Sequence, residues 1–207
     1  MNARYRKVVL ALACFIPAAY TGVALSPAPP AYASVSIAIS FDDLLRESVA
    51  AVIATPESAR TVWEDGRIIT YTQAHVDTLV AGSVAGAEEI WVRTRGGDIG
   101  HVGQAVEGEA VLTTGRSTLL FVRAPNAYAA TPYVVTARAQ GQFPVAVDGD
   151  GTLRVYASDA IGLLMPKASP PGSPSPSRPL AGEVLHGHTL TEAKATIAHA
   201  WGLHRAP

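Results

Sequence analysis

Between residues 49 and 156 the chain alternates short apolar segments with turns that contain glycine. The segments are rich in Val, Ile, Thr, Tyr and Phe, which are the residues enriched in strands. About seven short strands at a spacing of roughly 8–14 residues, with glycine turns between them, are typical of an all-β sandwich or barrel. The predicted strands are residues 49–54, 67–80, 90–93, 119–122, 132–136, 143–147 and 153–156. We therefore expect a β-barrel domain over residues 34–166.

Two of the turns carry the Asp-Gly pair that favours tight hairpins. Glu64-Asp65-Gly66-Arg67 predicts a hairpin whose second strand, residues 67–80, alternates in polarity as a long half-buried strand does. Asp148-Gly149-Asp150-Gly151 begins like a calcium-binding loop, but the rest of an EF-hand is missing, including its terminal Glu. A turn between the last two strands is the preferred interpretation.

Helix signals flank the predicted strands. Ser40 can cap a short helix from Phe41 to about Ser48, with Asp43 three residues after the cap. Residues 167–180 hold five prolines and four serines, a composition that predicts a disordered linker. Thr189 or Thr191 can then cap a second helix that runs through Trp201. This tail, residues 181–207, either packs on the barrel or serves as a docking tail.

The first 33 residues have the order of a cleavable secretory signal. Cations at Arg4, Arg6 and Lys7 precede an apolar stretch over residues 8–25, and Ala31-Tyr32-Ala33 provides small residues at a signal peptidase site. We expect export to the periplasm or beyond, cleavage after Ala33, and no membrane span afterwards. A retained anchor and a lipid attached at Cys14 are the less favoured alternatives.

Composition narrows the chemistry of the mature chain. Cleavage removes the one cysteine, so disulfides, zinc–thiolate sites and iron–sulfur clusters are excluded. The remaining chain keeps 13 of 16 Lys+Arg and all 17 Asp+Glu, a mild negative charge that argues against a nucleic-acid partner.

No recognisable catalytic or cofactor motif is present. The glycine-rich stretch from Gly96 lacks the Lys-Ser/Thr of a phosphate loop, and neither a Gly-x-Ser-x-Gly elbow nor a His-Glu-x-x-His motif occurs. A hydrolase assembled only in space would use His75, His101 and Ser117. A metal-binding tail would use the late histidines, although their spacing does not match known ligand sets. These histidines are His186, His188, His199 and His204. We predict no metal site and no cofactor.

Several short motifs follow one another in a fixed order. They are an early helix, the apolar run 49–54, Trp63 before an acidic-Gly turn, Thr70-Tyr71-Thr72, Ala81-Gly82, Gly96-Gly97, Gly108-Glu109, Gly115 before the apolar segment 119–122, and Gln140-Gly141-Gln142-Phe143-Pro144-Val145. This order resembles a family of uncharacterised exported bacterial proteins and covers residues 40–155.

A more distant resemblance concerns the fold alone. The helix, strand and hairpin at the start, together with the closing strands, look like an OB-type barrel of the netrin/TIMP kind. TIMP proteins inhibit metalloproteases through an N-terminal cysteine, whereas the mature chain here would begin at Ser34 and has none. The resemblance therefore implies a small OB-like β-barrel and does not imply that inhibitory activity.

The favoured function is binding of another exported macromolecule, such as an exported protein, by a non-catalytic domain. In OB-type barrels the middle strands and the loops beside them form the ligand face. Here that region contains Trp91, Arg93 and Arg95, followed by Gly96 and Gly97. Strand alternation places Trp91 and the two arginines on one face, opposite Ile90 and Val92.

Overall fold

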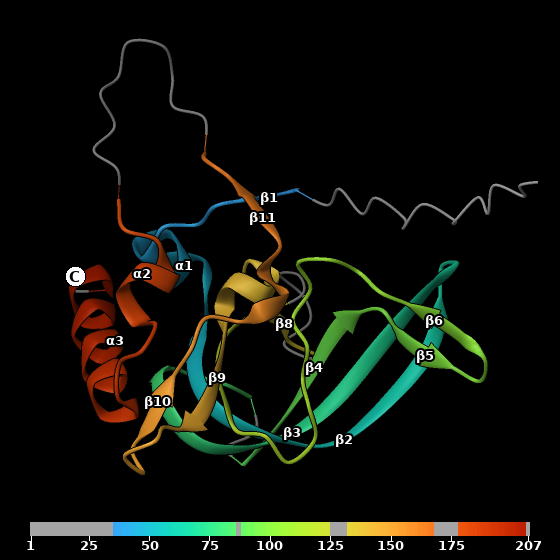
Figure 1. Ribbon diagram of the computed structural model, residues 1–207, viewed down its shortest axis with the longest axis horizontal. Coiled ribbons are helices and arrows are strands. Elements are labelled where there is room, and N and C mark those ends of the chain that lie inside the picture. The colour runs from blue at the N-terminus through green and yellow to red at the C-terminus, as the bar shows by residue number, and fades with distance from the viewer. Residues whose placement is uncertain (1–34, 86–87, 125–131, 168–177, 206–207) are drawn as a thin grey trace, which may run out of the picture. The chain divides into compact units, whose positions relative to one another are not determined.

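The computed structural model describes residues 35–85, 88–124, 132–167 and 178–205. The predicted signal peptide, its cleavage site and most of the predicted linker over residues 167–180 lie outside these ranges. Strands dominate the described chain and only three α-helices accompany them, which confirms the all-β class (Figure 1). None of the described helices is both long and apolar enough to cross a membrane.

The strands and helices follow one another in the order of their labels in Figure 1. The strands are β1 (Val35–Ile37), β2 (Ala50–Glu64), β3 (Arg67–Gly82), β4 (Glu89–Arg95), β5 (Gly97–Ile99), β6 (Val102–Gln104), β7 (Thr118–Arg123), β8 (Val134–Val135), β9 (Gln142–Val147), β10 (Leu153–Val155) and β11 (Leu163–Met165). The helices are α1 (Phe41–Glu47), α2 (Ala181–Leu185) and α3 (Leu190–Arg205), with 3-10 turns η1 (Arg138–Gly141) and η2 (Asp159–Ile161).

The main sheet is antiparallel and has the strand order β10-β9-β7-β2-β3-β4, with β8 also paired to β7. Among the described strands these ladders do not form a closed ring, so the predicted barrel is not found as a closed barrel. One short contact spans the gap between β4 and β8. Val92 and Tyr133 form an isolated parallel bridge, in which the Arg93 N–H donates to the Tyr133 carbonyl at 2.7 Å and the Tyr133 N–H donates to the Trp91 carbonyl at 2.7 Å.

The centre of the sheet is buried on both faces, which explains its continuous apolar segments. In β7, Leu119 and Phe121 join a helix-side core together with the apolar faces of α1, α2 and α3. Leu120 and Val122 point the other way into a strand-side core shared with β3, β4 and Tyr133. Figure 1 shows the three helices grouped near β9 and β10, while the β2–β3 hairpin extends away from them.

Helix α1 forms as its sequence predicts. The Ser40 hydroxyl accepts a hydrogen bond from the Asp43 N–H at 3.1 Å and so caps the first turn. Phe41, Leu44 and Leu45 are buried in the helix-side core. The helix ends at Glu47, one residue before the predicted end.

The tail packs on the β-domain. The Thr189 N–H donates to Glu192 Oε2 at 2.9 Å, and the Glu192 N–H donates to Thr189 Oγ1 at 3.2 Å. This reciprocal pair is a capping box, so Thr189 is the cap of α3. Leu185, Ile197 and Trp201 are buried against the helix-side core. Of the two predicted alternatives for the tail, the structure therefore shows the packed one.

Three features were not predicted from the sequence. Strand β2 continues to Glu64, ten residues beyond the apolar run, through a register shift between Pro56 and Ser58. The short β5–β6 hairpin follows Gly96. Strands β1 and β11 pair in parallel at the surface, where Val35 and Leu163 are among the exposed apolar side chains.

Candidate functional site

The residues predicted to bind lie on the outer face of β4. Ile90 and Val92 are buried at 1% and 0% exposure, whereas Trp91 is 37% exposed and Arg95 is exposed. Arg93 is half-buried between them. The burial pattern thus agrees with the predicted alternation and leaves the tryptophan and both arginines on one side of the strand.

A hydrogen-bonded carboxylate lies beside Arg93. Glu64 Oε1 accepts from Arg93 Nη2 at 2.7 Å, and Glu64 Oε2 accepts from the Tyr71 hydroxyl at 2.6 Å. The Tyr71 and Arg93 donors, in that order of effect, hold the pKa of Glu64 below its usual value. The same hydrogen bond, with burial, raises the pKa of Tyr71. Two donors from neighbouring strands therefore converge on one carboxylate.

Arg60 extends this surface onto β2. Arg60 pairs with Tyr71, and Tyr71 pairs with Arg93, so the three side chains form a row across β2, β3 and β4 on one face of the sheet. The Arg60 guanidinium lies 6.0 Å from the centre of the Tyr71 ring. We call the surface formed by Arg60, Glu64, Tyr71, Trp91, Arg93 and Arg95 the arginine face.

The charges of the arginine face are not balanced. Glu64 pairs with Arg93, but in the described part of the chain no carboxylate lies within salt-bridge distance of Arg60 or Arg95. Arg95 acts on the buried Glu109 only through its longer-range field. The face therefore carries two unneutralised guanidinium groups beside an exposed aromatic ring.

Gly96 and Gly97 shape the end of β4. Their φ angles are +93° and +123°, which favour glycine. A Cβ on Gly96 would lie 2.5 Å from the Gln104 carbonyl oxygen, and one on Gly97 would lie 2.3 Å from Thr70 Oγ1. Both glycines are required by close packing of the β5–β6 hairpin. Their predicted place in the binding site stays a prediction.

The three candidate hydrolase residues are not brought together. Ser117 precedes β7 and His75 lies in β3, so β2 separates them in the sheet. His101 lies in the turn of the β5–β6 hairpin, which packs near Thr61 and Thr70. Among the hydrogen bonds of the described residues, none joins the side chains of these three.

Two of the late histidines fasten the tail to the rest of the fold. His186 Nδ1 accepts from the Ala157 N–H at 3.1 Å, and its ring meets Tyr156 edge to face at 5.5 Å. His204 Nε2 lies 3.4 Å from Asp42 Oδ1. In the described ranges no group of three His, Cys, Asp or Glu side chains is arranged to hold a metal ion.

The Asp148–Gly151 segment is a turn between β9 and β10, as predicted. The Asp148 N–H donates to the Thr152 carbonyl at 2.9 Å. Arg154 forms ion pairs with Asp148 at 3.0 Å and with Asp150 at 3.4 Å. Both carboxylates of the turn are thus engaged by an arginine of the adjoining strand.

The Gln140-Gly141-Gln142 motif fastens distant segments to the sheet. The Gln140 side-chain amide accepts from the Ile39 N–H and donates to the Ile37 carbonyl, each at 2.9 Å. Gln142 bonds both backbone groups of Val111 in the same way. A Cβ on Gly141 would lie 2.1 Å from the Thr136 carbonyl oxygen. This part of the motif is therefore structural.

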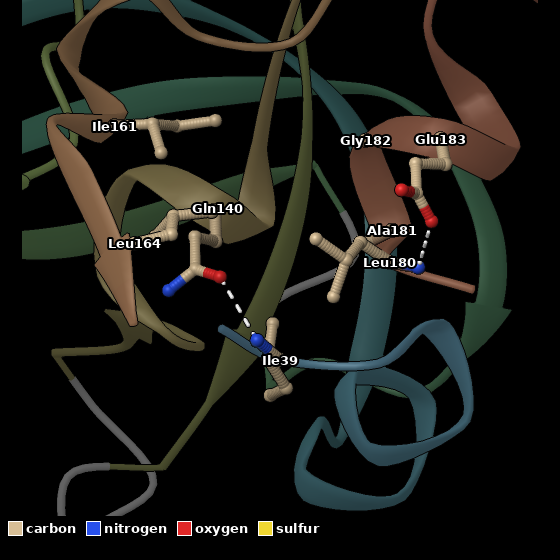
Figure 2. Close-up of a pocket in the computed structure, with 8 residues that line it drawn as sticks. All are labelled: Ile39, Gln140, Ile161, Leu164, Leu180, Ala181, Gly182 and Glu183. Carbon is tan, nitrogen blue, oxygen red and sulfur yellow. Dashed lines mark hydrogen bonds between the residues drawn. The ribbon is translucent and has the colours of Figure 1, made fainter. Parts of the chain in front are cut away.

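A small cavity of about 190 Å³ lies beside Gln140 (Figure 2). Its lining residues are Ile39, Gln140, Ile161, Leu164, Leu180, Ala181, Gly182 and Glu183. The Gln140 carbonyl is bonded to Ile39, and Glu183 Oε2 accepts from the Leu180 N–H at 2.8 Å. The cavity is mostly apolar, and both of its polar side chains already have partners.

Arg60, Glu64 and Tyr71 are the residues of the arginine face that were not predicted. The signal that identifies them is the Asp65-Gly66 turn. A two-residue turn pairs Glu64 with Arg67, and counting back along both strands pairs Arg60 with Tyr71. Extending the first strand through Pro56 was the step that the apolar pattern did not suggest.

Comparisons with family models, curated proteins and solved structures found no match for this chain.

Proposed function

We propose that this protein is an exported, non-catalytic domain that binds another exported macromolecule through the arginine face. The observation that carries the proposal is the outward position of Trp91 beside Arg93 and Arg95 on a strand whose other face is buried. Tryptophan, tyrosine and arginine are the residue types most enriched among the hot spots of protein interfaces.

The finer proposal for the fold is a small OB-type barrel. The strand neighbours β7-β2-β3-β4 are those of a ring that closes through β8, and β8 pairs with β7. The parallel bridge between Val92 and Tyr133 supports closure at the remaining position, between β4 and β8. In such a barrel the arginine face lies on the outside of the middle strands, where OB-type folds bind their ligands.

Truncation of the aromatic side chain tests the function. Trp91→Ala, and a double variant with Arg93→Ala and Arg95→Ala, are expected to keep the fold and to lose about 30-fold or more in affinity for partners captured from an extracellular or periplasmic extract. This corresponds to the loss of about 2 kcal/mol that defines a hot spot. Binding is measured by titration of each captured partner against each variant.

Matched controls lie on the same hairpin and in a nearby loop. Trp63 is 56% exposed and points to the opposite face of β2 from Arg60, and Arg116 is an exposed arginine before β7. Trp63→Ala and Arg116→Ala should leave binding unchanged. If folded Trp91→Ala retains every partner at full affinity, the arginine face is not the binding site.

Export is tested separately by the mass of the secreted chain. Because residues 1–33 have the order of a secretory signal, the protein recovered outside the cytoplasm is expected to begin at Ser34. Intact-mass measurement decides this. A retained Met1 or a lipid on Cys14 would contradict it.

A further inference from the structure

We infer that the partner is an acidic polypeptide segment, and that Glu64 occupies the place of a partner carboxylate while the arginine face is free. This inference rests on the proposed function and names the chemistry of the partner. Its first support is charge. The six residues of the face include three arginines, Arg60, Arg93 and Arg95, and one acid, Glu64. Glu89 lies at the start of the same side of β4, and the chain as a whole has a net charge of −1.

The second support is the geometry around Glu64. Its two oxygens accept one hydrogen bond each, from Arg93 Nη2 at 2.7 Å and from the Tyr71 hydroxyl at 2.6 Å. A guanidinium and a hydroxyl that converge on one carboxylate form a receptor for carboxylates in general. Glu64 is the last residue of β2, directly before the Asp65-Gly66 turn, and its side chain is 35% exposed. A carboxylate of a partner would thus find the Arg93 and Tyr71 donors already in position, with the accessible side chain of Glu64 as the group it must displace.

The third support concerns how a partner can approach. Strand addition at the edge of β4 is blocked beside Trp91 and Arg93, because the backbone of Tyr133 already bonds there. The free edge of β10 is also engaged, since Val155 exchanges hydrogen bonds with His188 and Gly187. With these two edges engaged, we propose that the partner lies on the face and is recognised by side chains.

The spacing of the arginines favours an extended polypeptide. Arg93 and Arg95 are two residues apart on one strand, so their Cα atoms are separated by about 6.6–6.8 Å. Alternate side chains of an extended partner have the same spacing. Acids at alternating positions of such a segment therefore fall opposite successive arginines, with Trp91 next to them to contact an apolar or aromatic neighbour.

The test uses the full mature chain and a defined probe, an eight-residue peptide that alternates Glu and Thr. The wild-type protein is expected to bind this peptide, with an affinity that falls as salt is raised, and to ignore the Lys-Thr peptide of equal length. Glu64→Gln removes the internal competitor's charge and keeps an oxygen as acceptor for Arg93. The affinity of Glu64→Gln for the Glu-Thr peptide should rise about fivefold. In the wild type, Glu64 occupies the receptor in part of the molecules, and the apparent affinity is reduced in proportion to the fraction in which the receptor is free.

Glu57→Gln is the matched control, since Glu57 is an exposed acid of the same strand and its loss changes the net charge equally. It should leave the affinity within about twofold of the wild type, as expected for a charge outside the contact. Arg93→Ala should abolish the gain given by Glu64→Gln. Equal gains in Glu57→Gln and Glu64→Gln, or no gain in either, would overturn the role of Glu64.

Two further outcomes separate this inference from the proposed function. A uronic-acid oligosaccharide that binds tighter than the Glu-Thr peptide would replace the polypeptide partner with an acidic glycan. Loss of captured partners in Trp91→Ala, together with no binding of any acidic probe, would leave the proposed function in place and reject the acidic partner. Retention of all partners in Trp91→Ala would reject the function itself.

Discussion

Removal of residues 178–207 is expected to unfold the β-domain. Leu185, Ile197 and Trp201 are 0%, 0% and 8% exposed in the helix-side core, where they cover β2 and β7. Burying each such side chain contributes about 1.5–3 kcal/mol, so their joint loss is comparable to the roughly 5–15 kcal/mol of a whole domain. Far-ultraviolet circular dichroism and thermal melting of residues 34–167 and 34–207 provide the comparison.

The control for this truncation is a protein cleaved between the β-domain and the tail, in which both fragments are kept. Proteolysis is predicted to cleave between Lys167 and Leu180 before it cleaves the core. The two fragments should then stay associated and melt as one unit, because the contacts of Trp201 and Ile197 do not depend on the connection. A truncated protein that melts like the intact one would show that the tail adds nothing to the core.

Replacement of Phe121 by Ala is expected to lower the free energy of unfolding by about 3–5 kcal/mol, the usual cost of deleting a buried phenyl ring. Phe121 is 0% exposed and meets Phe41 of α1 and Phe143 of β9 edge to face, with ring centres 6.5 Å and 6.1 Å apart. The ring therefore joins the first helix to the sheet. Urea unfolding of Phe121→Ala measures the loss.

Val147→Ala is the companion variant. Val147 lies in β9 near Phe143 but is 67% exposed, so its truncation should change the free energy of unfolding by less than about 0.5 kcal/mol. Similar losses in Val147→Ala and Phe121→Ala would mean that the aromatic cluster is not the centre of the core.

Local signals predicted the elements that local chemistry controls. The Ser40 and Thr189 caps, the Asp65-Gly66 hairpin and the continuously apolar β7 were all recognisable, because each depends on residues within a few positions. The β1–β11 pair was not predicted. It joins Val35 to Leu163 in parallel, and no turn connects the two segments to indicate that they pair. The second half of β2 was also not predicted, because the polar residues around Pro56 interrupt the apolar pattern of the strand.

The candidate site also contains residues that local sequence signals predicted and residues that they did not. Alternation along β4 predicted which side of the strand Trp91, Arg93 and Arg95 share, because side-chain direction follows from the strand period alone. Glu64 and Tyr71 required the register between two strands. The side-chain amides of Gln140 and Gln142, which bond backbone groups of remote segments, follow no periodic pattern and became visible only in the folded chain.

Segments from the start and the end of the described chain contact each other, and these contacts affect how the chain folds. Asp42 Oδ1 and His204 Nε2 lie 3.4 Å apart although 162 positions separate the two residues. Ser40 also forms an isolated antiparallel β-bridge with Leu180, directly before α2. Such distant contacts are formed late and slow the folding rate, because a long loop must close before they stabilise anything. We therefore expect the first strand and helix to reach their native packing only after the last helix is available. A chain exported as we propose would stay unfolded until most of it had crossed the membrane, the state in which a translocation channel accepts it.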